Sequence, residues 1–304
     1  NGEMLKIAQA TKRQHEEKLS KPEIYSEVER EHLRRQELNN RDFLEYFRSL
    51  TERRAGANRS NWASALKYLE AFTGGSLKFQ DLSVTMLEDF KRYLMNAKST
   101  RSEKTTLAKS SAASYFLKVK AALREAFKAG ILQTDLNAEI KPIKAPTPRR
   151  EYLTIAELNK LAKTPCLAPV LKRAALFSAL TGLRFSDIAK LTWAEVQNVT
   201  GEGYFLNFSQ KKTAGTEYHP ISDQAAGLMG EPGEPSEQVF MGLNYSAYSN
   251  KHLAQWIGAA GITKNITFHS FRHSYATNQL LAGTDIYTVS KMLGHTDLKS
   301  TQIY

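Results

Sequence analysis

Six polar side chains in the second half of the sequence have types and spacings that could carry out phosphoryl transfer. They are Arg184, Lys212, His269, Arg272, His295 and Tyr304. His269 and Arg272 stand three residues apart, so on a helix both project from one face. Arg184 and His295 each follow a glycine-containing segment that would end a helix. Lys212 falls at the tip of a segment that alternates like a β-hairpin.

Together, two guanidiniums, two imidazoles, an ammonium and a phenol suit the transfer of a phosphodiester to a side-chain hydroxyl without a metal ion. The transition state gathers negative charge on the non-bridging oxygens, which paired arginines hold by bidentate hydrogen bonds. A phenol is a weak nucleophile at neutral pH and needs a base or a positive potential, and the departing 5′ oxygen needs a proton donor. Taken singly, such residues are more commonly solvated or locally hydrogen-bonded, so only the set points to this chemistry.

The order and spacing of these residues resemble those of the tyrosine recombinases, the phage-type integrases. The matching segments are Thr-Gly-Leu-Arg184-Phe-Ser-Asp187, Lys212-Thr, His269-Ser-Phe-Arg272-His, Leu-Gly-His295 and the terminal Tyr304. The resemblance covers residues 41–304. The Gln-Lys-Lys-Thr form of the lysine segment and the charged N-terminal helix are most similar to integrases of conjugative transposons and other bacterial mobile elements.

The resemblance implies which residues meet the DNA phosphate. Tyr304 is the expected nucleophile, which forms a 3′-phosphotyrosyl bond and frees a 5′ hydroxyl. Arg184 and Arg272 are expected to hold the scissile phosphate, and His295 to donate a further hydrogen bond to it. Asp187, one helical turn from Arg184, is expected to orient that guanidinium from behind.

The resemblance also implies how protons move. Lys212 is the expected general acid for the leaving 5′ oxygen, because the lysine of the family directly precedes a threonine, and the neighbouring Lys211 is its competitor. His269 is expected to assist proton transfer from Tyr304. His273 adjoins the motif but lies about 100° round the helix from Arg272, so we expect it to pack or cap.

Other conspicuous residues match no motif. The tryptophans of the second half are expected in the core rather than on a base-stacking surface. These unmatched residues are His15, His32, His219, His252, Trp193 and Trp256.

The elements that must position the six residues are mainly helical. Apolar residues at helical spacing through 41–145 predict a four-helix, SAM-like core-binding bundle, with helices near 43–50, 62–72, 86–94 and 107–127. After it, a capping box at Thr154 and Glu157 opens the first of several helices, the others near 168–180, 185–191, 246–259, 268–282 and 285–293. Residues 204–209 and 216–221 predict a hairpin, and 231–237 a loop. We therefore expect a mainly α chain with a mixed α+β catalytic domain.

Breaks in composition predict the domain boundaries. Residues 1–40 are dense in charge and predict a helical tether, 41–145 the core-binding domain, 146–150 a proline-rich linker and 151–304 the catalytic domain. The chain lacks an initiator Met and stops at the expected nucleophile, so we expect missing segments at both ends, including a C-terminal tail.

Positive charge is concentrated in the middle third of the chain. The formal net charge is +11, and residues 41–150 hold 21 basic against 11 acidic side chains. Focused charge of this kind attracts a polyanion. Charge density alone nominates DNA contacts, which are Lys91, Arg92, Lys98, Arg101, Lys104 and Lys109.

Composition also excludes several classes of protein. A single cysteine rules out a disulfide scaffold, an iron–sulfur cluster and a thiolate zinc site, and no apolar run approaches the length of a membrane span. We expect no metal and no cofactor, since the catalytic segment has no acidic cluster of the kind that two-metal nucleases need.

The expected function is therefore a cytoplasmic, nucleoid-associated site-specific DNA recombinase. It would act on double-stranded DNA as a homotetramer through a Holliday junction, be monomeric without DNA, and work with accessory DNA-bending proteins. Two alternatives remain, a type IB-like topoisomerase and a catalytically silent DNA-binding protein.

Overall fold

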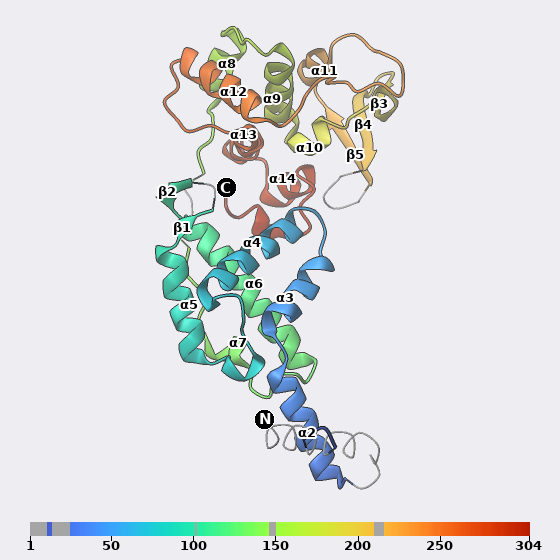
Figure 1. The fold of residues 1–304 in the computed structure, drawn as a ribbon. Coiled ribbons are helices and arrows are strands. Elements are labelled where there is room, and N and C mark those ends of the chain that lie inside the picture. Colours follow the sequence, from blue (N-terminus) through green and yellow to red (C-terminus); the bar gives the residue numbers. More distant parts are fainter. Residues whose placement is uncertain (1–10, 14–24, 101, 146–149, 210–215) are drawn as a thin grey trace. The chain divides into compact units, whose positions relative to one another are not determined.

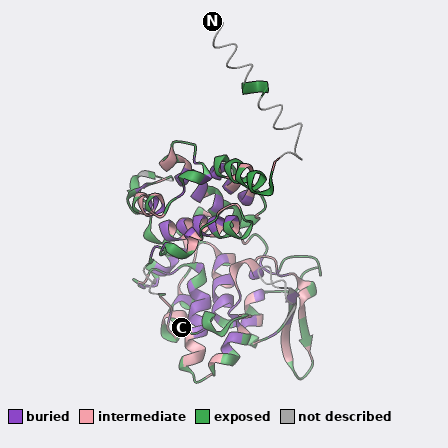
Figure 2. Ribbon diagram, turned by 90° about the horizontal axis from the view of Figure 1, so that it is seen from below, coloured by how far each residue is buried: buried purple, intermediate pink, exposed green. Residues whose placement is uncertain are grey.

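The structure, a computed structural model, describes residues 11–13, 25–100, 102–145, 150–209 and 216–304. The chain divides into two compact units, residues 1–147 and 148–304 (Figure 1). Each unit has its own buried core, seen in Figure 2 as separate groups of buried helix faces. The two units are described separately below.

The first unit is a helical bundle. Its elements are α2 (Glu27–Asn40), α3 (Phe43–Glu52), α4 (Gly56–Thr73), the 3-10 turn η2 (Phe79–Asp81), α5 (Val84–Asn96), β1 (Lys98–Ser99), β2 (Ser102–Thr106), α6 (Lys109–Lys128) and α7 (Leu136–Glu139). The four bundle helices α3 to α6 follow the four periodic segments of the sequence. Phe47, Phe90 and Phe116 are fully buried at its centre, because the apolar face of each helix turns inward.

Helix α2 differs from the bundle helices, since none of its residues is buried. It begins with a capping box in which Ser26 and Glu29 bond each other's backbone, and acidic residues fill its first turn. Local interactions of this kind hold a helix that has no apolar face to bury.

The second unit carries the six candidate residues. Its elements are α8 (Ile155–Lys163), α9 (Pro169–Thr181), α10 (Phe185–Ile188), η3 (Trp193–Glu195), β3 (Val196–Val199), β4 (Gly203–Ser209), β5 (Thr216–Ile221), α11 (Asp223–Met229), α12 (Ala247–Ala259), α13 (Phe268–Leu281), α14 (Ile286–Met292) and η4 (Leu298–Ser300). Helix α9 is its centre, because α8, α10, α11, α12 and α13 all contact it. The sheet lies to one side of these helices (Figure 1).

The sheet is antiparallel with strand order β3-β4-β5. Tyr204 pairs with Ile221 and Ser209 with Thr216, which is the hairpin expected from the alternating pattern. Leu206 and Phe208 point from β4 into the core and are almost fully buried. Residues 210–215, which join β4 to β5 along the chain, lie outside the described residues.

The sequence prediction of a mainly α fold with a small β-hairpin is confirmed, with several additions. Strands β1, β2 and β3 and helix α11 had no predicted counterpart. Helix α10 ends at Ile188 instead of continuing to residue 191, because residues 192–195 turn into the 3-10 segment that leads to β3. The loop predicted for 231–237 contains no helix or strand.

Among the described residues, no helix combines the length and apolar character that crossing a membrane requires.

Candidate active site

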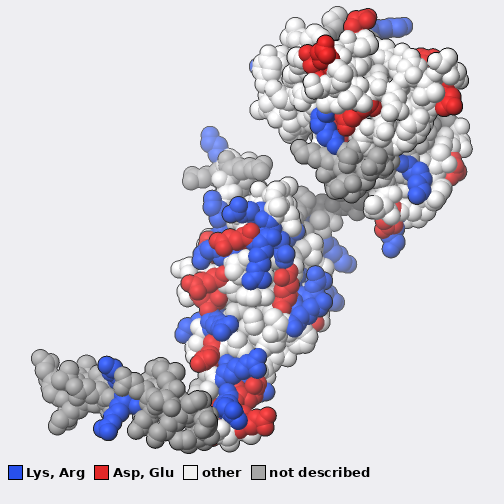
Figure 3. Space-filling model, turned by 90° about the vertical axis from the view of Figure 1, so that its right-hand side faces the viewer, with Lys and Arg blue, Asp and Glu red and all other residues white. Residues whose placement is uncertain are grey.

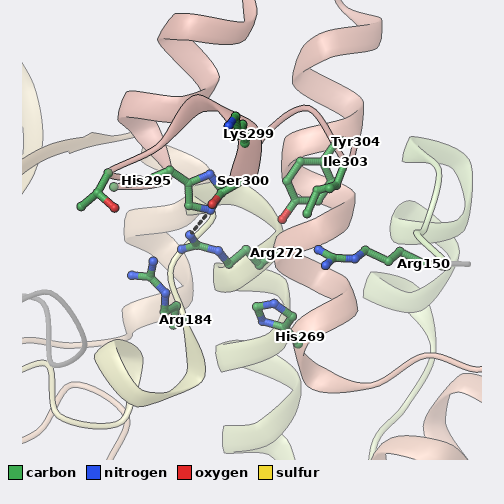
Figure 4. A pocket seen from close by; sticks show the side chains of 11 residues that line it. Arg150, Arg184, His269, Arg272, His295, Lys299, Ser300, Ile303 and Tyr304 are labelled. Atoms are coloured by element: carbon green, nitrogen blue, oxygen red, sulfur yellow. Dashed lines mark hydrogen bonds between the residues drawn. The ribbon is translucent and has the colours of Figure 1, made fainter. Parts of the chain in front are cut away.

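A pocket of about 520 Å³ brings together five of the six predicted residues, all within the second unit. Arg184, His269, Arg272, His295 and Tyr304 line it, joined by Arg150 and Lys299. In Figure 4, Arg184 and Arg150 enter from opposite sides, with Arg272 between them. Lys212 and its competitor Lys211 lie outside the described residues.

Arg272 is the buried centre of this pocket, with 2% of its surface exposed. Its Nη1 donates to the Gly182 carbonyl at 2.7 Å and its Nη2 to the Leu293 carbonyl at 2.7 Å. Burial, and then the charge of Arg184, lower the pKa of Arg272 to about 10, so it remains protonated at neutral pH. A buried cation whose remaining surface faces a pocket is arranged to hold an anion.

The Gly182 carbonyl is available because α9 ends there. Gly182 adopts a left-handed conformation with φ 73°, and its N–H bonds the Ser178 carbonyl. Ser178 Oγ in turn donates to the Leu183 carbonyl at 2.8 Å. This turn delivers Arg184 to the pocket as the residue that precedes α10.

Arg184 lies beside Asp187, the carboxylate expected to orient it. Its Nη1 lies 3.7 Å from Asp187 Oδ2, and the Asp187 side chain is 1% exposed. A buried carboxylate behind a guanidinium fixes the direction of its planar fork.

His295 also contacts Arg272. Its Nε2 lies 3.1 Å from Arg272 Nη2, the contact dashed in Figure 4, and its Nδ1 lies 2.8 Å from Thr301 Oγ1. Because a guanidinium can only donate, His295 accepts through Nε2 here and carries its proton on Nδ1, which donates to Thr301. Thr301 is fully buried, so this pair anchors the segment that leads to Tyr304.

Tyr304 reaches the pocket with its hydroxyl on the side of Arg272 (Figure 4). Burial raises the pKa of its phenol, while the charges of Arg272 and Arg150 act in the opposite direction. The hydroxyl lies 2.9 Å from Nδ1 of His273, a contact that the sequence prediction missed. His273 does pack, as expected, with 8% exposed, and it packs against Tyr304, the expected nucleophile.

The sequence contained a signal for His273. It follows His269 by four residues, so both lie on one face of α13, and their rings meet edge-on with centroids 4.4 Å apart. The angle between His273 and Arg272 on the helix does not show this relation, whereas the spacing from His269 does. Burial, and then the charges of surrounding basic groups, lower the pKa of His273 to about 3; those groups are His269, Arg150, Arg272 and His295.

Arg150 was also missed, because the sequence placed it in the linker. The segment that follows it is fixed to the second unit: Leu153 N–H donates to Ser274 Oγ at 2.8 Å, and Asn278 Nδ2 donates to the Leu153 carbonyl at 3.1 Å. Lys264 Nζ donates to the Tyr152 carbonyl at 2.9 Å. These bonds place Arg150 at the pocket as a further cation.

Most of the histidines and tryptophans that match no motif pack within the second unit. Trp256 is 2% exposed and donates to the Thr164 carbonyl at 3.1 Å, and Trp193 is half-buried against the same core. His219 is buried in β5, and burial lowers its pKa to about 4. His252 packs edge-on against Tyr248, and His32 is exposed. His15 lies outside the described residues.

The nominated DNA contacts divide into two groups. Lys91 Nζ lies 2.8 Å from Glu88, and Arg92 pairs with Asp89, so both already have local ionic partners. Lys98, Lys104 and Lys109 are exposed near the β1–β2 hairpin and the start of α6. Arg101 lies outside the described residues. On the face shown in Figure 3, Lys and Arg cover much of the first unit, whereas the second unit is mostly uncharged.

Within the described ranges, no three His, Cys, Asp or Glu side chains come together as a metal site would need.

Comparisons with known proteins show to which family the chain is similar. The phage integrase family matches residues 151–304, and the phage integrase SAM-like domain matches residues 42–141. The tyrosine recombinase XerC of Neisseria meningitidis is 32% identical over 190 residues, which cover 58% of this chain and 61% of that relative. XerC of Rhizobium meliloti is 26% identical over 269 residues, 84% of each chain. The chain thus matches less than two thirds of the length of the Neisseria relative.

Two solved structures have a similar fold. A lambda integrase dimer bound to a COC′ core site has a TM-score of 0.64 at 19% identity and covers 98% of this chain and 85% of that one. The Tn1549 transposon integrase in complex with a circular intermediate DNA has a TM-score of 0.64 at 16% identity, covering 86% and 94%. With both of its units matched in order, this chain belongs to the phage integrase family.

Proposed function

We propose that this protein is a tyrosine-type site-specific DNA recombinase that integrates or excises a mobile element. One observation carries the proposal: the phenol of Tyr304 shares a pocket with Arg184, Arg272 and His295. Two guanidiniums and an imidazole around a phenol are the groups that phosphodiester transfer to tyrosine needs.

In this proposal Tyr304 attacks the scissile phosphorus and the 5′ oxygen leaves, giving a 3′-phosphotyrosyl bond. Arg184 and Arg272 hold the non-bridging oxygens. His295 can join them once Nε2 carries a proton, because that nitrogen now accepts from Arg272. Lys212 is the proposed acid for the leaving oxygen, and the bond energy is kept in the phosphotyrosine, so ATP is not required.

The partners and organisation are also part of the proposal. The basic bundle of residues 41–145 would bind double-stranded DNA beside the catalytic domain of 151–304, joined by the linker 146–150. A lambda integrase tetramer has been solved bound to a Holliday junction. We propose the same assembly here, with accessory DNA-bending proteins and a location at the nucleoid. Residues 1–40 would serve as a tether.

The test is covalent trapping with EDTA present. Nicked duplexes from the DNA flanking the gene are incubated with the protein and resolved on a denaturing gel, wild type beside Tyr304→Phe. A protease-sensitive adduct that Tyr304→Phe abolishes is the expected result, because that variant lacks only the attacking oxygen.

Two further readouts separate the alternatives. Recombinant strand-exchange products indicate a recombinase, whereas relaxation of supercoiled plasmid without such products indicates a topoisomerase. DNA binding without any adduct contradicts the enzymatic proposal.

A further inference from the structure

The hydroxyl proton of Tyr304 must leave when the phenolic oxygen attacks phosphorus, and one side chain is placed to take it. We infer that His273 accepts this proton through Nδ1. The inference rests on the function proposed above and gives His273 the role that the resemblance implies for His269.

The geometry places an acceptor at the reacting atom. His273 Nδ1 lies 2.9 Å from the Tyr304 hydroxyl, within the range needed for direct proton transfer. His273 is buried on α13, and the rings of His269 and Tyr304 both contact its ring, so packing fixes its position. A contact between a buried imidazole and a nucleophilic hydroxyl has the arrangement of an activating pair.

Burial first, and then the charges around His273, decide its protonation. Tyr304 contacts the ring, and Glu151 lines a pocket with it. The groups whose charges lower its pKa are His269, Arg150, Arg272 and His295. All are cationic or able to become so, and they oppose a further positive charge on the ring. His273 is therefore neutral at neutral pH, and with Nε2 carrying the ring proton, Nδ1 is free to accept from the phenol.

Binding of the substrate phosphate would make His273 a stronger base. A phosphodiester held by Arg184 and Arg272 brings negative charge into this group of cations, and that charge grows in the transition state. An anion near an imidazole favours its protonated form. The basicity of His273 thus rises when the phosphate is present, which couples deprotonation of Tyr304 to substrate binding.

The step is balanced. The bond between phosphorus and the Tyr304 oxygen forms, the bond between phosphorus and the 5′ oxygen breaks, and the phenolic proton moves to His273. The leaving oxygen takes a proton from Lys212. Religation returns both protons along the same path.

The test measures the rate of adduct formation for His273→Asn and His273→Ala. Asparagine places its side-chain oxygen near the site of Nδ1, so it keeps the hydrogen bond but cannot take a proton. We expect both variants to be slowed by about 10²–10⁴-fold, the usual contribution of a general base. DNA binding and thermal unfolding, measured alongside, show that His273→Asn is folded.

A second substrate distinguishes a residue that takes the proton of Tyr304 from one that protonates the leaving 5′ oxygen. A duplex with sulfur in place of the bridging 5′ oxygen has a leaving thiolate, which needs no proton because thiols are far more acidic than alcohols. Lys212→Ala should recover most of its rate on this substrate, whereas both His273 variants should stay slow. Lys212→Ala is thus the matched control.

Two results would overturn the inference. One is wild-type cleavage by His273→Asn, which would make His273 only a positioning residue. The other is recovery of His273→Ala on the sulfur substrate, which would place it on the leaving-group side. In both cases wild type still forms the Tyr304 adduct, whereas absence of that adduct would instead refute the proposed function.

Discussion

At the scale of single residues, Arg272 both holds the main chain in place and presents a positive charge to the pocket. Each of its two terminal nitrogens bonds a different main-chain carbonyl, and its buried charge faces the pocket. Lysine cannot span both carbonyls, because its ammonium is a point charge rather than a fork. We therefore expect Arg272→Lys to lower adduct formation by about 10²–10³-fold, as loss of one oxyanion-binding donor does.

Arg173→Lys is the matched control. Arg173 also donates to a main-chain carbonyl of this unit, that of Met229 at 3.0 Å, but it does not line the pocket. Both variants should melt at a lower temperature, and only Arg272→Lys should lose cleavage. Equal loss of cleavage would mean that Arg272 acts through stability alone.

His219 gives a prediction about acid stability. Its folded pKa of about 4 is below the ordinary value of 6.5, so protonation favours the unfolded chain. The stabilisation is complete above pH 6.5 and is lost as the pH falls towards 4, in total about 3 kcal/mol. In denaturant titrations from pH 7 to 4, His219→Gln should show a shallower fall in the free energy of unfolding than wild type. Parallel curves would contradict the prediction.

At the scale of elements, the end of α9 links packing to the site. Gly182 has φ 73°, and a Cβ there would lie 2.6 Å from Tyr275 Cδ1 and 2.9 Å from Leu293 Cδ2. Gly182→Ala should cost about 2–5 kcal/mol, from the left-handed conformation and from overpacking. It should also slow adduct formation, because the displaced carbonyl is the one that holds Arg272.

The variant Gly283→Ala distinguishes the cost of the left-handed conformation from the cost of overpacking. Gly283 is also left-handed, with φ 89°, but a Cβ there meets nothing within 4 Å. Thermal unfolding should show a smaller loss for Gly283→Ala, with cleavage retained. Equal losses in both variants would exclude the packing argument.

The same elements show what the sequence could predict. Helices α3 to α6 carry long apolar periodicities, and β4 and β5 alternate, so their burial is encoded locally. Strands β1 and β3 are too short for a period, and their pairing is set by the partner strand. Five of the six residues selected by type and spacing line one pocket, and Lys212 lies outside the described residues. The neighbours His273 and Arg150 were not predicted, since His273 depends on its contact with Tyr304 and Arg150 on the bonds that fix Leu153 to α13 and Tyr152 to Lys264.

At the scale of the whole molecule, the distribution of charge separates binding from chemistry. Residues 41–150 hold 21 basic and 11 acidic side chains, whereas 151–304 hold 13 and 12. The second unit instead brings Arg184, Arg272 and Lys299 to one pocket, where the proposed function has them meet a single phosphate. Affinity for DNA should therefore depend mainly on the first unit, and cleavage on the second.

Salt dependence tests this division. Lys98, Lys104 and Lys109 are exposed, whereas Lys91 and Arg92 have acidic neighbours that a phosphate would have to replace. Changing the three exposed lysines to glutamine should lower DNA affinity and reduce the slope of log K against log salt by up to about 3, since each phosphate contact contributes about 0.9. The control changes three exposed lysines of the second unit, Lys160, Lys163 and Lys251, to glutamine. This control variant should leave the slope near that of wild type. An equal reduction in both triple variants would show that DNA does not bind preferentially to the basic surface of the bundle.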